Sequence, residues 1–334
     1  MDGLRAVAVT SVMLSHAYTQ YLPGGWVGVE IFFVLSGYLI TRLLIAENAA
    51  TGRIDLARFY IRRVLRLMPA LWCLLAFMGL VFATSDDAAA LGKSWVMAAT
   101  YLMNWNRAFG WWPQDYLGHT WSLAIEEQYY LLWPLIFLVI RRHALTLIGA
   151  LIAVAMLWRL WLLLQGAGYD RLYNGFDTHA DPLLIGCALA YLKITEGWEQ
   201  KISRGWPVYA TVIGAASLFG ISQPMLVAGI PLIAVMSAGL IVASRRGFFN
   251  RALSLPPLVF TGKISYGLYL WHFPLLKLAS VNFPGTKAIV VLAATYCIAS
   301  LSWFTVERYF RHLKVKLEAG QFDLYARTLR RVGD

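Results

Sequence analysis

Two ionisable side chains lie inside an otherwise apolar stretch near the start of the sequence. Arg5 and His16 are the only charged or imidazole side chains of a predicted helix over residues 4–22. At about 100° per residue they face the same way to within roughly 20°, about 16 Å apart along the axis. Ionisable groups inside a membrane helix are costly and usually face protein or a cavity. This pair therefore predicts two functional positions along a single path through the protein.

Side chains from other predicted helices are expected at the same depth as His16. Counting residues inward from the outer ends of the predicted spans places Glu30, Glu126, Asp181 and His272 at one outer level. Because each is an acid or an imidazole, the sequence predicts a titratable cavity rather than scattered polar exceptions. Asp181 and His272 also fit a simpler role as polar residues at the ends of spans.

One predicted helix carries several polar groups on a single face. In TWSLAIEEQYYLLWP, the side chains of Ser122, Glu126 and Tyr130 recur at i, i+4 and i+8, and Tyr129 is adjacent. A buried carboxylate beside a hydroxyl and a phenol favours a functional role for Glu126. The other interpretation is an acid that is satisfied by donors from neighbouring helices.

A basic segment is expected at the opposite, inner level. In DLARFYIRRVLRLMP, the residues Arg58, Arg62 and Arg66 form a helical stripe with Arg63 beside it, and Pro69 is expected to open the next span. One interpretation is an interfacial helix whose cations contact anionic lipid headgroups. The other is a clamp for a phosphorylated ligand that arrives from the cytoplasm, because guanidinium groups match phosphate geometry.

The composition identifies the class of protein that must position these residues. The 334 residues are 59% hydrophobic and only 14% charged, whereas soluble domains have about 25% charged residues. The sequence therefore predicts an all-α, polytopic integral membrane protein. About ten transmembrane helices are expected, over the following apolar runs: 4–22, 26–45, 69–84, 121–140, 144–165, 181–193, 207–222, 225–243, 257–277 and 286–308.

The net charge of +11 has a distribution that argues for membrane topology and against nucleic acid. Most Lys and Arg residues fall on one side when residues 90–104 do not cross, and the positive-inside rule makes that side cytoplasmic. Residues 85–120 are then expected to form an outer loop with a re-entrant or surface-lying piece. Both termini are expected to be cytoplasmic, and membrane lipids are the expected surroundings.

The remaining motifs narrow the chemistry to two mechanisms. The sequence has no P-loop, GxGxxG, HExxH or GxSxG motif, and the LGHT and DTHADP stretches lack a second cluster that would complete a metal site. One mechanism is group transfer across the membrane, with His16 as general base toward an acceptor hydroxyl. The alternative is a proton-coupled transporter that uses His16, Glu30 and Glu126 as a relay.

Six blocks of the sequence resemble one known family in the same order. They are DGLRAVAV followed by SHA, GGWVGVEIFFVLSGYLIT, RFYIRRVLRLMPA, HTWSLAIEEQYYLLWP, ADPLLIGCALA and ISYGLYLWHFPLL. These blocks are similar to those of the acyltransferase-3 family of integral-membrane O-acyltransferases, and they cover nearly the whole chain. The resemblance implies transfer of an acyl group, often acetyl, from cytoplasmic acyl-CoA (acetyl-CoA) as co-substrate. The acceptors it implies are hydroxyls of carbohydrates or glycolipids, such as the O-antigen of lipopolysaccharide, exopolysaccharide and lipo-oligosaccharide.

The resemblance also implies roles for individual residues. By matching position, His16 is the catalytic histidine and Arg5 its partner, and Arg63 and Arg66 match the basic motif linked to donor use. Glu126 and Glu30 match acidic positions, so either is expected to stabilise the imidazolium. Arg58 and Arg62 are grouped with the donor-binding arginines. The residues expected to contact the acceptor are Ser122, Tyr129, Tyr130, Asp181 and His272.

The expected organisation is one membrane domain with a short tail. Residues 1–311 are predicted to form the transmembrane acyltransferase domain and residues 312–334 a cytoplasmic tail. The expected location is the bacterial inner, or cytoplasmic, membrane. No metal is expected, and nothing in the sequence specifies an oligomeric state.

Overall fold

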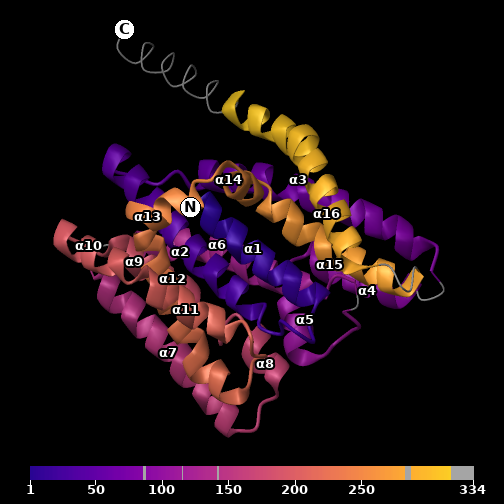
Figure 1. The fold of residues 1–334 in the computed structure, drawn as a ribbon, viewed down its shortest axis with the longest axis horizontal. Coiled ribbons are helices and arrows are strands. Elements are labelled where there is room, and N and C mark those ends of the chain that lie inside the picture. The colour runs from indigo at the N-terminus through magenta and orange to yellow at the C-terminus, as the bar shows by residue number, and fades with distance from the viewer. Residues whose placement is uncertain (86–87, 115, 141–142, 283–286, 317–334) are drawn as a thin grey trace.

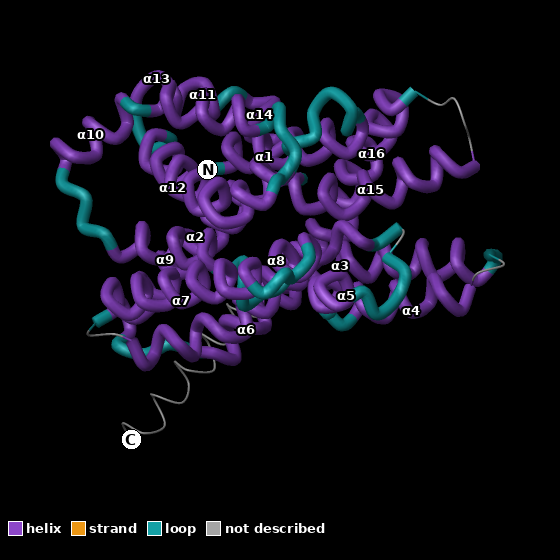
Figure 2. The backbone as a smooth tube through the Cα atoms, turned by 90° about the horizontal axis from the view of Figure 1, so that it is seen from below, coloured by secondary structure: helices purple, strands orange, loops and turns teal. Residues whose placement is uncertain are grey.

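The computed structural model describes the chain apart from residues 86–87, 115, 141–142, 283–286 and 317–334. Every regular element among the described residues is helical, as Figure 2 shows, which confirms the all-α class. The elements are α1 (Asp2–Ala17), α2 (Trp26–Thr51), α3 (Leu56–Ala83), α4 (Ala88–Ala99), α5 (Met103–Phe109), the 3-10 turn η1 (Gly118–Thr120), α6 (Trp121–Ile140), α7 (Ala144–Leu164), α8 (Tyr169–Asn174), α9 (Asp181–Tyr191), α10 (Glu196–Arg204), α11 (Trp206–Ala216), the π turn η2 (Met225–Gly229), α12 (Ile230–Ala243), α13 (Gly247–Leu253), α14 (Pro256–Lys263), α15 (Ser265–Asn282), α16 (Ala288–Ser302) and the π turn η3 (Trp303–Glu307).

Several helices are long and apolar enough to cross a membrane. By length and composition, 6 helices within the described part of the chain meet this description. They are Trp26–Thr51, Leu56–Ala83, Gly118–Ile140, Ala144–Leu164, Met225–Ala243 and Ala288–Lys316. This supports a multi-pass membrane protein. The total of about ten spans stays a prediction, and so does the re-entrant piece within residues 85–120. The division between domain and tail at residue 311 is also untested. Most of the predicted tail, residues 317–334, lies outside the described residues.

The first helix ends earlier than the sequence predicts. It stops at Ala17 rather than continuing through residue 22, and the N–H groups of Tyr21 and Leu22 both bond to the carbonyl of Tyr18 in a turn. The N–H of Gly24 then bonds to the carbonyl of Ser217 at the end of α11, so the connection follows a neighbouring helix. His16 consequently lies in the last turn of α1, and the predicted end of this helix at residue 22 is wrong.

Two other boundaries differ from the predicted ones. The basic segment and the following span form a single helix, α3, with Pro69 inside it rather than at its start. Membrane helices tolerate a proline because neighbouring groups satisfy the backbone that it frees. Conversely, the predicted span 257–277 is divided into α14 and α15, which meet at Ile264. Because α3 is continuous, its arginines belong to the same rigid helix as the apolar segment that is long enough to cross a membrane.

Helix α1 lies near the middle of the molecule, beside α2 and α15 (Figure 1). Glycines make this close approach possible. A side chain at Gly28 of α2 would meet the carbonyl of Ala8, and one at Gly262 of α14 would meet the backbone of Asp2. Small residues at such contacts are typical of helix pairs that pack in membranes. The central position of α1 brings its polar residues against several other helices.

Helices α2 and α9 form the most extensive helix pair, and glycines line both sides of it. A Cβ atom at Gly37 would collide with the backbone carbonyl of Leu183, and one at Gly186 would collide with the carbonyl of Val34. Because backbone atoms cannot move aside cheaply, these positions accept only glycine without a shift of the helices.

The Gly37→Ala substitution is expected to destabilise the protein. The added methyl group overpacks the α2–α9 contact, which costs about 1–3 kcal/mol in well-packed interiors. The matched control is Gly92→Ala in α4, where nothing lies within 4 Å of the added atom. Thermal unfolding of the purified protein in detergent should show a lower midpoint for Gly37→Ala and an unchanged or higher one for Gly92→Ala. Equal midpoints would contradict the predicted close contact.

Candidate active site

A cavity of about 400 Å³ opens beside the N-terminal end of α1. It lies between α1, α2, α3, α6 and α15, and we call it the central cavity. Its wall mixes apolar side chains with polar and charged ones. The polar and charged lining residues are Asp2, Arg5, Ser36, Arg63, Arg66, Ser122, Glu126, Tyr130, Ser265, Tyr266 and Tyr269.

The charged groups of the central cavity suit an anionic ligand. Three guanidinium groups, those of Arg5, Arg63 and Arg66, face it together with the carboxylates of Asp2 and Glu126. The Arg5 Nη1 atom lies 3.6 Å from Asp2 Oδ1, and the Arg63 guanidinium lies 5.2 Å from the centre of the Tyr130 ring. Three cations against two acids leave a net positive wall, and guanidinium groups bind phosphate and carboxylate groups well.

The predicted polar face of α6 points into this cavity. Ser122, Glu126 and Tyr130 all line it, and the Ser36 hydroxyl donates to Glu126 Oε1 at 2.6 Å. Tyr129 turns away from the cavity: its hydroxyl lies 3.1 Å from Cys187 Sγ in α9. The 3.6-residue helical period explains both results, since Tyr129 lies about 100° around the helix from Tyr130.

The predicted arginine clamp is only half assembled. Arg63 and Arg66 line the central cavity, but Arg58 and Arg62 do not. An Nη atom of Arg62 lies 3.2 Å from Glu47 Oε2 of α2, and the backbone N–H of Arg58 donates to the Asp55 carboxylate that caps α3. The predicted stripe therefore runs along α3 so that only its last member, Arg66, reaches the cavity.

His16 contacts a second histidine across two helices. Its Nδ1 atom lies 2.8 Å from Nε2 of His272 in α15, and the two rings stack with centroids 5.1 Å apart. His16 is exposed, whereas His272 is fully buried. The prediction that His272 lies at the level of His16 is therefore confirmed, but it contacts His16 rather than an open acceptor site.

The hydrogen bonds fix which nitrogen of His16 is free. Nδ1 of His272 lies 2.8 Å from the Tyr269 carbonyl and 3.1 Å from the Leu268 carbonyl, and a carbonyl only accepts, so this nitrogen carries the proton. A buried imidazole without an acid partner is neutral, so Nε2 of His272 accepts. His16 must then donate from Nδ1, which leaves the lone pair of His16 Nε2 available as a base.

A third histidine completes this cluster. His119, in η1, donates from Nε2 to the Leu270 carbonyl at 3.1 Å, and its ring lies 5.6 Å from the His272 ring. The Phe273 ring packs against both His16 and His119, with centroid distances of 5.0 and 5.1 Å. The described residues contain no group of three His, Cys, Asp or Glu side chains that could hold a metal ion.

The central cavity stops short of His16. Its wall includes Ser122 and Tyr269, whose hydroxyl oxygens are 2.6 Å apart, and the Tyr269 ring lies 5.5 Å from His272. His16 lies on the far side of these residues and does not line the cavity. Arg5 and His16 share a helix face as predicted, but the rings of Tyr269 and His272 intervene between the cavity and His16.

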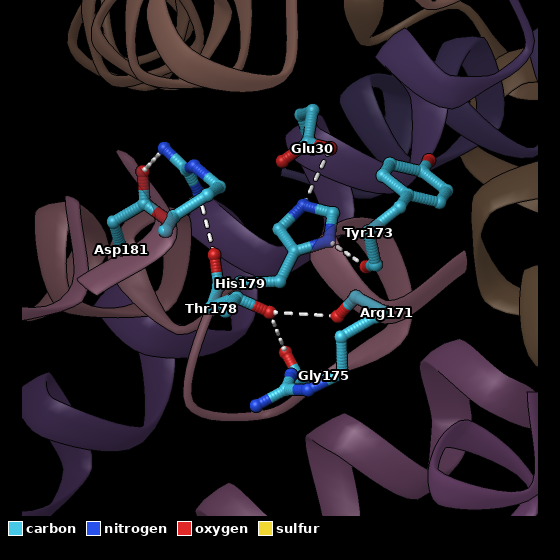
Figure 3. Close-up of polar contacts among 8 residues, drawn as sticks. Glu30, Arg171, Tyr173, Gly175, Thr178, His179 and Asp181 are labelled. Atoms are coloured by element: carbon cyan, nitrogen blue, oxygen red, sulfur yellow. Dashed lines mark hydrogen bonds and ion pairs between the residues drawn. The ribbon is translucent and has the colours of Figure 1, made fainter. Parts of the chain in front are cut away.

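Glu30 contacts His179 rather than His16, whose imidazolium the sequence predicts it to stabilise. Its Oε1 atom lies 2.9 Å from Nε2 of His179, whose Nδ1 lies 2.5 Å from the Tyr173 carbonyl (Figure 3). Glu30 and His179 are both fully buried. This pair joins α2 to the segment before α9, and it provides a hydrogen-bond partner for one oxygen of a buried carboxylate. Glu126 likewise lies in the central cavity and not against His16.

Asp181 has a structural partner rather than an open site. Both of its carboxylate oxygens bond to the guanidinium of Arg159 in α7, at 2.8 and 3.0 Å, and both side chains are fully buried. Arg159 also donates to the Thr178 carbonyl at 2.6 Å. The pair anchors the start of α9, where Figure 3 shows Asp181, to α7, and contact of Asp181 with an acceptor stays a prediction.

Comparison with known proteins identifies the family of this chain. The profile of the family described as Acyltransferase domain matches residues 1–306. The chain belongs to the acyltransferase-3 family. This confirms the family and the enzyme class, an acyltransferase, that the sequence predicts. No solved structure matches the chain significantly.

Two curated relatives of this chain are named as O-acetyltransferases. The chain is 32% identical to peptidoglycan O-acetyltransferase OatA of Listeria monocytogenes over 93% of its own length and 55% of that protein. It is also 32% identical to O-acetyltransferase OatA of Staphylococcus aureus over 93% of its length and 57% of that protein. The chain thus spans little more than half the length of these relatives.

The structure brings to the site several residues for which the sequence predicts no role. His119 and His179 belong to the LGHT and DTHADP stretches, which do not complete a metal site, and no motif marks Tyr269 or Ser36. The position of His119, three residues before Ser122, was a usable signal, since the two lie at the same end of a predicted span. Nothing in the sequence pairs Glu30 with His179, which are far apart in the chain.

The Asp181→Ala substitution should destabilise the fold. It leaves the Arg159 guanidinium buried without a counter-charge, which costs about 3–5 kcal/mol for a fully buried pair. The control is Glu196→Ala, whose side chain is 88% exposed and pairs with Arg246 at 3.7 Å, so little change is expected. The measurement is the thermal midpoint in detergent. An Asp181→Ala protein of normal stability with impaired acceptor use would instead favour the predicted contact with an acceptor.

Proposed function

We propose that this chain is a membrane-embedded O-acetyltransferase with His16 as general base. It moves an acetyl group from acyl-CoA, reached from the cytoplasm, to a hydroxyl of a cell-envelope carbohydrate. The observation that carries the proposal is the exposed imidazole of His16, whose Nδ1–H is held by buried His272 so that Nε2 is free to accept a proton. Family membership supports the acyl transfer, and the names of the relatives support acetyl.

The central cavity suits the donor. The guanidinium groups of Arg5, Arg63 and Arg66 provide positive charge for its phosphates, and Met1 and Asp2 place the opening at the N-terminal end of α1. The apolar part of the wall, with Phe32 and other side chains, suits an uncharged arm. The acyl end must pass the Ser122–Tyr269 hydrogen bond to reach His16. Both chain ends are assigned to the cytoplasm in this proposal.

The chemistry follows from the proton positions. His16 Nε2 accepts the proton of the acceptor hydroxyl while that oxygen attacks the thioester carbonyl carbon. The carbon–sulfur bond breaks, and the leaving sulfur takes a proton from the imidazolium, which gives an ester and a free thiol. Throughout, His16 Nδ1–H donates to His272 Nε2, so the imidazolium is stabilised by His272 and not by Glu126 or Glu30. A covalent acyl-histidine route would use the same nitrogen of His16.

The acceptor in this proposal is inferred from the names of the relatives. The Listeria monocytogenes relative is named for peptidoglycan, so a glycan hydroxyl of peptidoglycan is the first acceptor to test. This replaces O-antigen and exopolysaccharide as the leading candidates. The protein is placed in the bacterial cytoplasmic membrane, with His16 facing the outer side where such a glycan is assembled.

The His16→Ala variant should lose acyl transfer and stay folded. Removing the base costs about 10²–10⁴-fold in rate. The assay follows free thiol release from acetyl-CoA by the purified protein with peptidoglycan glycan strands as acceptor. The control is His143→Ala, an exposed histidine at the start of α7. Transfer by His16→Ala at the normal rate would refute the proposal, and solute flux coupled to a proton gradient without thiol release would favour a transporter.

His272 should act as a positioning residue. With His272→Ala the Nδ1–H of His16 loses its acceptor, so the ring is misoriented and kcat should fall about 10- to 100-fold. The KM for acetyl-CoA should stay unchanged, because His272 does not line the central cavity. The His272→Gln variant offers an amide oxygen near the position of Nε2 and should restore part of kcat. If His272→Ala raised KM and left kcat unchanged, His272 would not act through His16.

A further inference from the structure

A second cavity, of about 310 Å³, adjoins the central cavity on its cytoplasmic side in the topology proposed above. We call it the side cavity. Helices α1, α3 and α15 contribute to both cavities, and Arg5, Arg66 and Tyr266 line both. The rest of the side cavity is formed by the α14–α15 junction and by the helix that continues from η3. The two cavities are therefore neighbours that share part of their walls.

The side cavity carries more positive charge than its own acids balance. Arg66, Lys263, Arg311 and Lys314 line it together with Arg5, against the carboxylates of Asp2 and Glu307. These cations come from α3, from α14 and from the end of the last described helix, so residues far apart in sequence meet here. A convergent group of guanidinium and ammonium groups is the common way in which proteins bind phosphate groups.

An aromatic surface lies next to these cations. The Arg311 guanidinium carbon lies 3.6 Å from the centre of the Trp303 indole ring, and Phe310 and Tyr266 also line the cavity. A guanidinium stacked on an indole makes a broad planar surface. Planar nucleobases stack on such surfaces, each stack contributing measurably to affinity. Phosphate-binding cations beside an aromatic platform together indicate a nucleotide.

The buried carboxylate of Glu307 indicates which chemical group of a nucleotide would contact it. Glu307 is 8% exposed, and within the described residues its Oε1 atom has no hydrogen-bond partner. It ends the π turn η3, and π turns within α-helices are often found at functional sites. A buried acceptor without a donor is costly, so a donor from a ligand would stabilise the site. The exocyclic amine of adenine is such a donor, whereas a bare phosphate is repelled by the carboxylate.

We propose that the side cavity binds the adenine nucleotide end of the acyl donor. The phosphates contact Lys263, Arg311 and Arg66, the base lies against Trp303 near Glu307, and the acyl-bearing arm extends into the central cavity. Only the identification of the arm as the acyl-bearing part of acyl-CoA rests on the proposed function. Recognition of an adenosine phosphate by the side cavity can be measured without any acyl transfer.

The test uses the full chain in detergent and adenosine 3′,5′-bisphosphate as probe, with binding followed by calorimetry. Arg311→Ala and Lys263→Ala should each weaken probe binding about 10-fold, the loss of one charge-assisted contact. The matched control is Arg308→Ala, on the same helix but not in the lining of the side cavity, which should bind normally. Unchanged binding in both Arg311→Ala and Lys263→Ala would overturn the assignment.

Two further probes separate a nucleotide site from a simple phosphate site. Inorganic phosphate and glycerol 1-phosphate, which mimics a lipid headgroup, should bind far more weakly than the adenosine probe. Equal affinity for all three would overturn the nucleotide assignment in favour of a phosphate or lipid site. The Glu307→Leu variant should reduce the preference for the adenosine probe over its inosine analogue, which lacks the exocyclic amine; an unchanged preference would contradict the role of Glu307.

Turnover measurements distinguish failure of this inference from failure of the proposed function. In Arg311→Ala and Lys263→Ala the KM for acetyl-CoA should rise about 10-fold while kcat is kept, because His16 is untouched. If the wild-type protein transfers acetyl groups and these variants keep the normal KM, the side-cavity assignment is wrong and the function stands. If the probe binds and is lost in the variants but no acyl transfer occurs, the nucleotide site stands and the proposed function fails.

Discussion

The hydrogen bond between His16 Nδ1 and His272 Nε2 connects the first helix of the chain to α15 and orients the imidazole that we propose as the general base. It depends on backbone carbonyls of α15, because these hold the proton on the other nitrogen of His272. In many hydrolases a carboxylate orients the catalytic histidine. Here a neutral imidazole does so, which suits an apolar surrounding because no net charge is buried in the resting state.

The same cost of buried charge separates structural acids from functional ones. Asp181 bonds to Arg159 through both carboxylate oxygens, and Glu30 bonds to His179 through Oε1, so these acids already help to hold α2, α7 and α9 together. Glu126 instead faces a cavity beside arginines. Charged residues in membrane helices thus have two roles in this protein. Some form ion pairs and hydrogen bonds with one another inside the helix bundle, where water is excluded. Others line a cavity and remain accessible to a ligand.

The sequence predicted parts of the fold and the site that depend on local periodicity. Ser122, Glu126 and Tyr130 share the face that lines the central cavity, and Arg63 and Arg66 reach the same cavity from α3. The end of α1 and the continuity of α3 were wrong. Both depend on distant contacts: the loop after α1 bonds to Ser217, and Pro69 sits in a helix supported by its neighbours.

Composition and motif order by themselves determined a helical membrane acyltransferase in which Arg5 and His16 share one face of the first helix. Those properties are local, because apolar length and a 3.6-residue period act within one segment. Only the tertiary structure decided that Glu30 pairs with His179, that His272 holds His16, and that Tyr269 separates His16 from the central cavity. A side chain finds its partner through helix packing, which brings His16 against His272, 256 positions away in the chain.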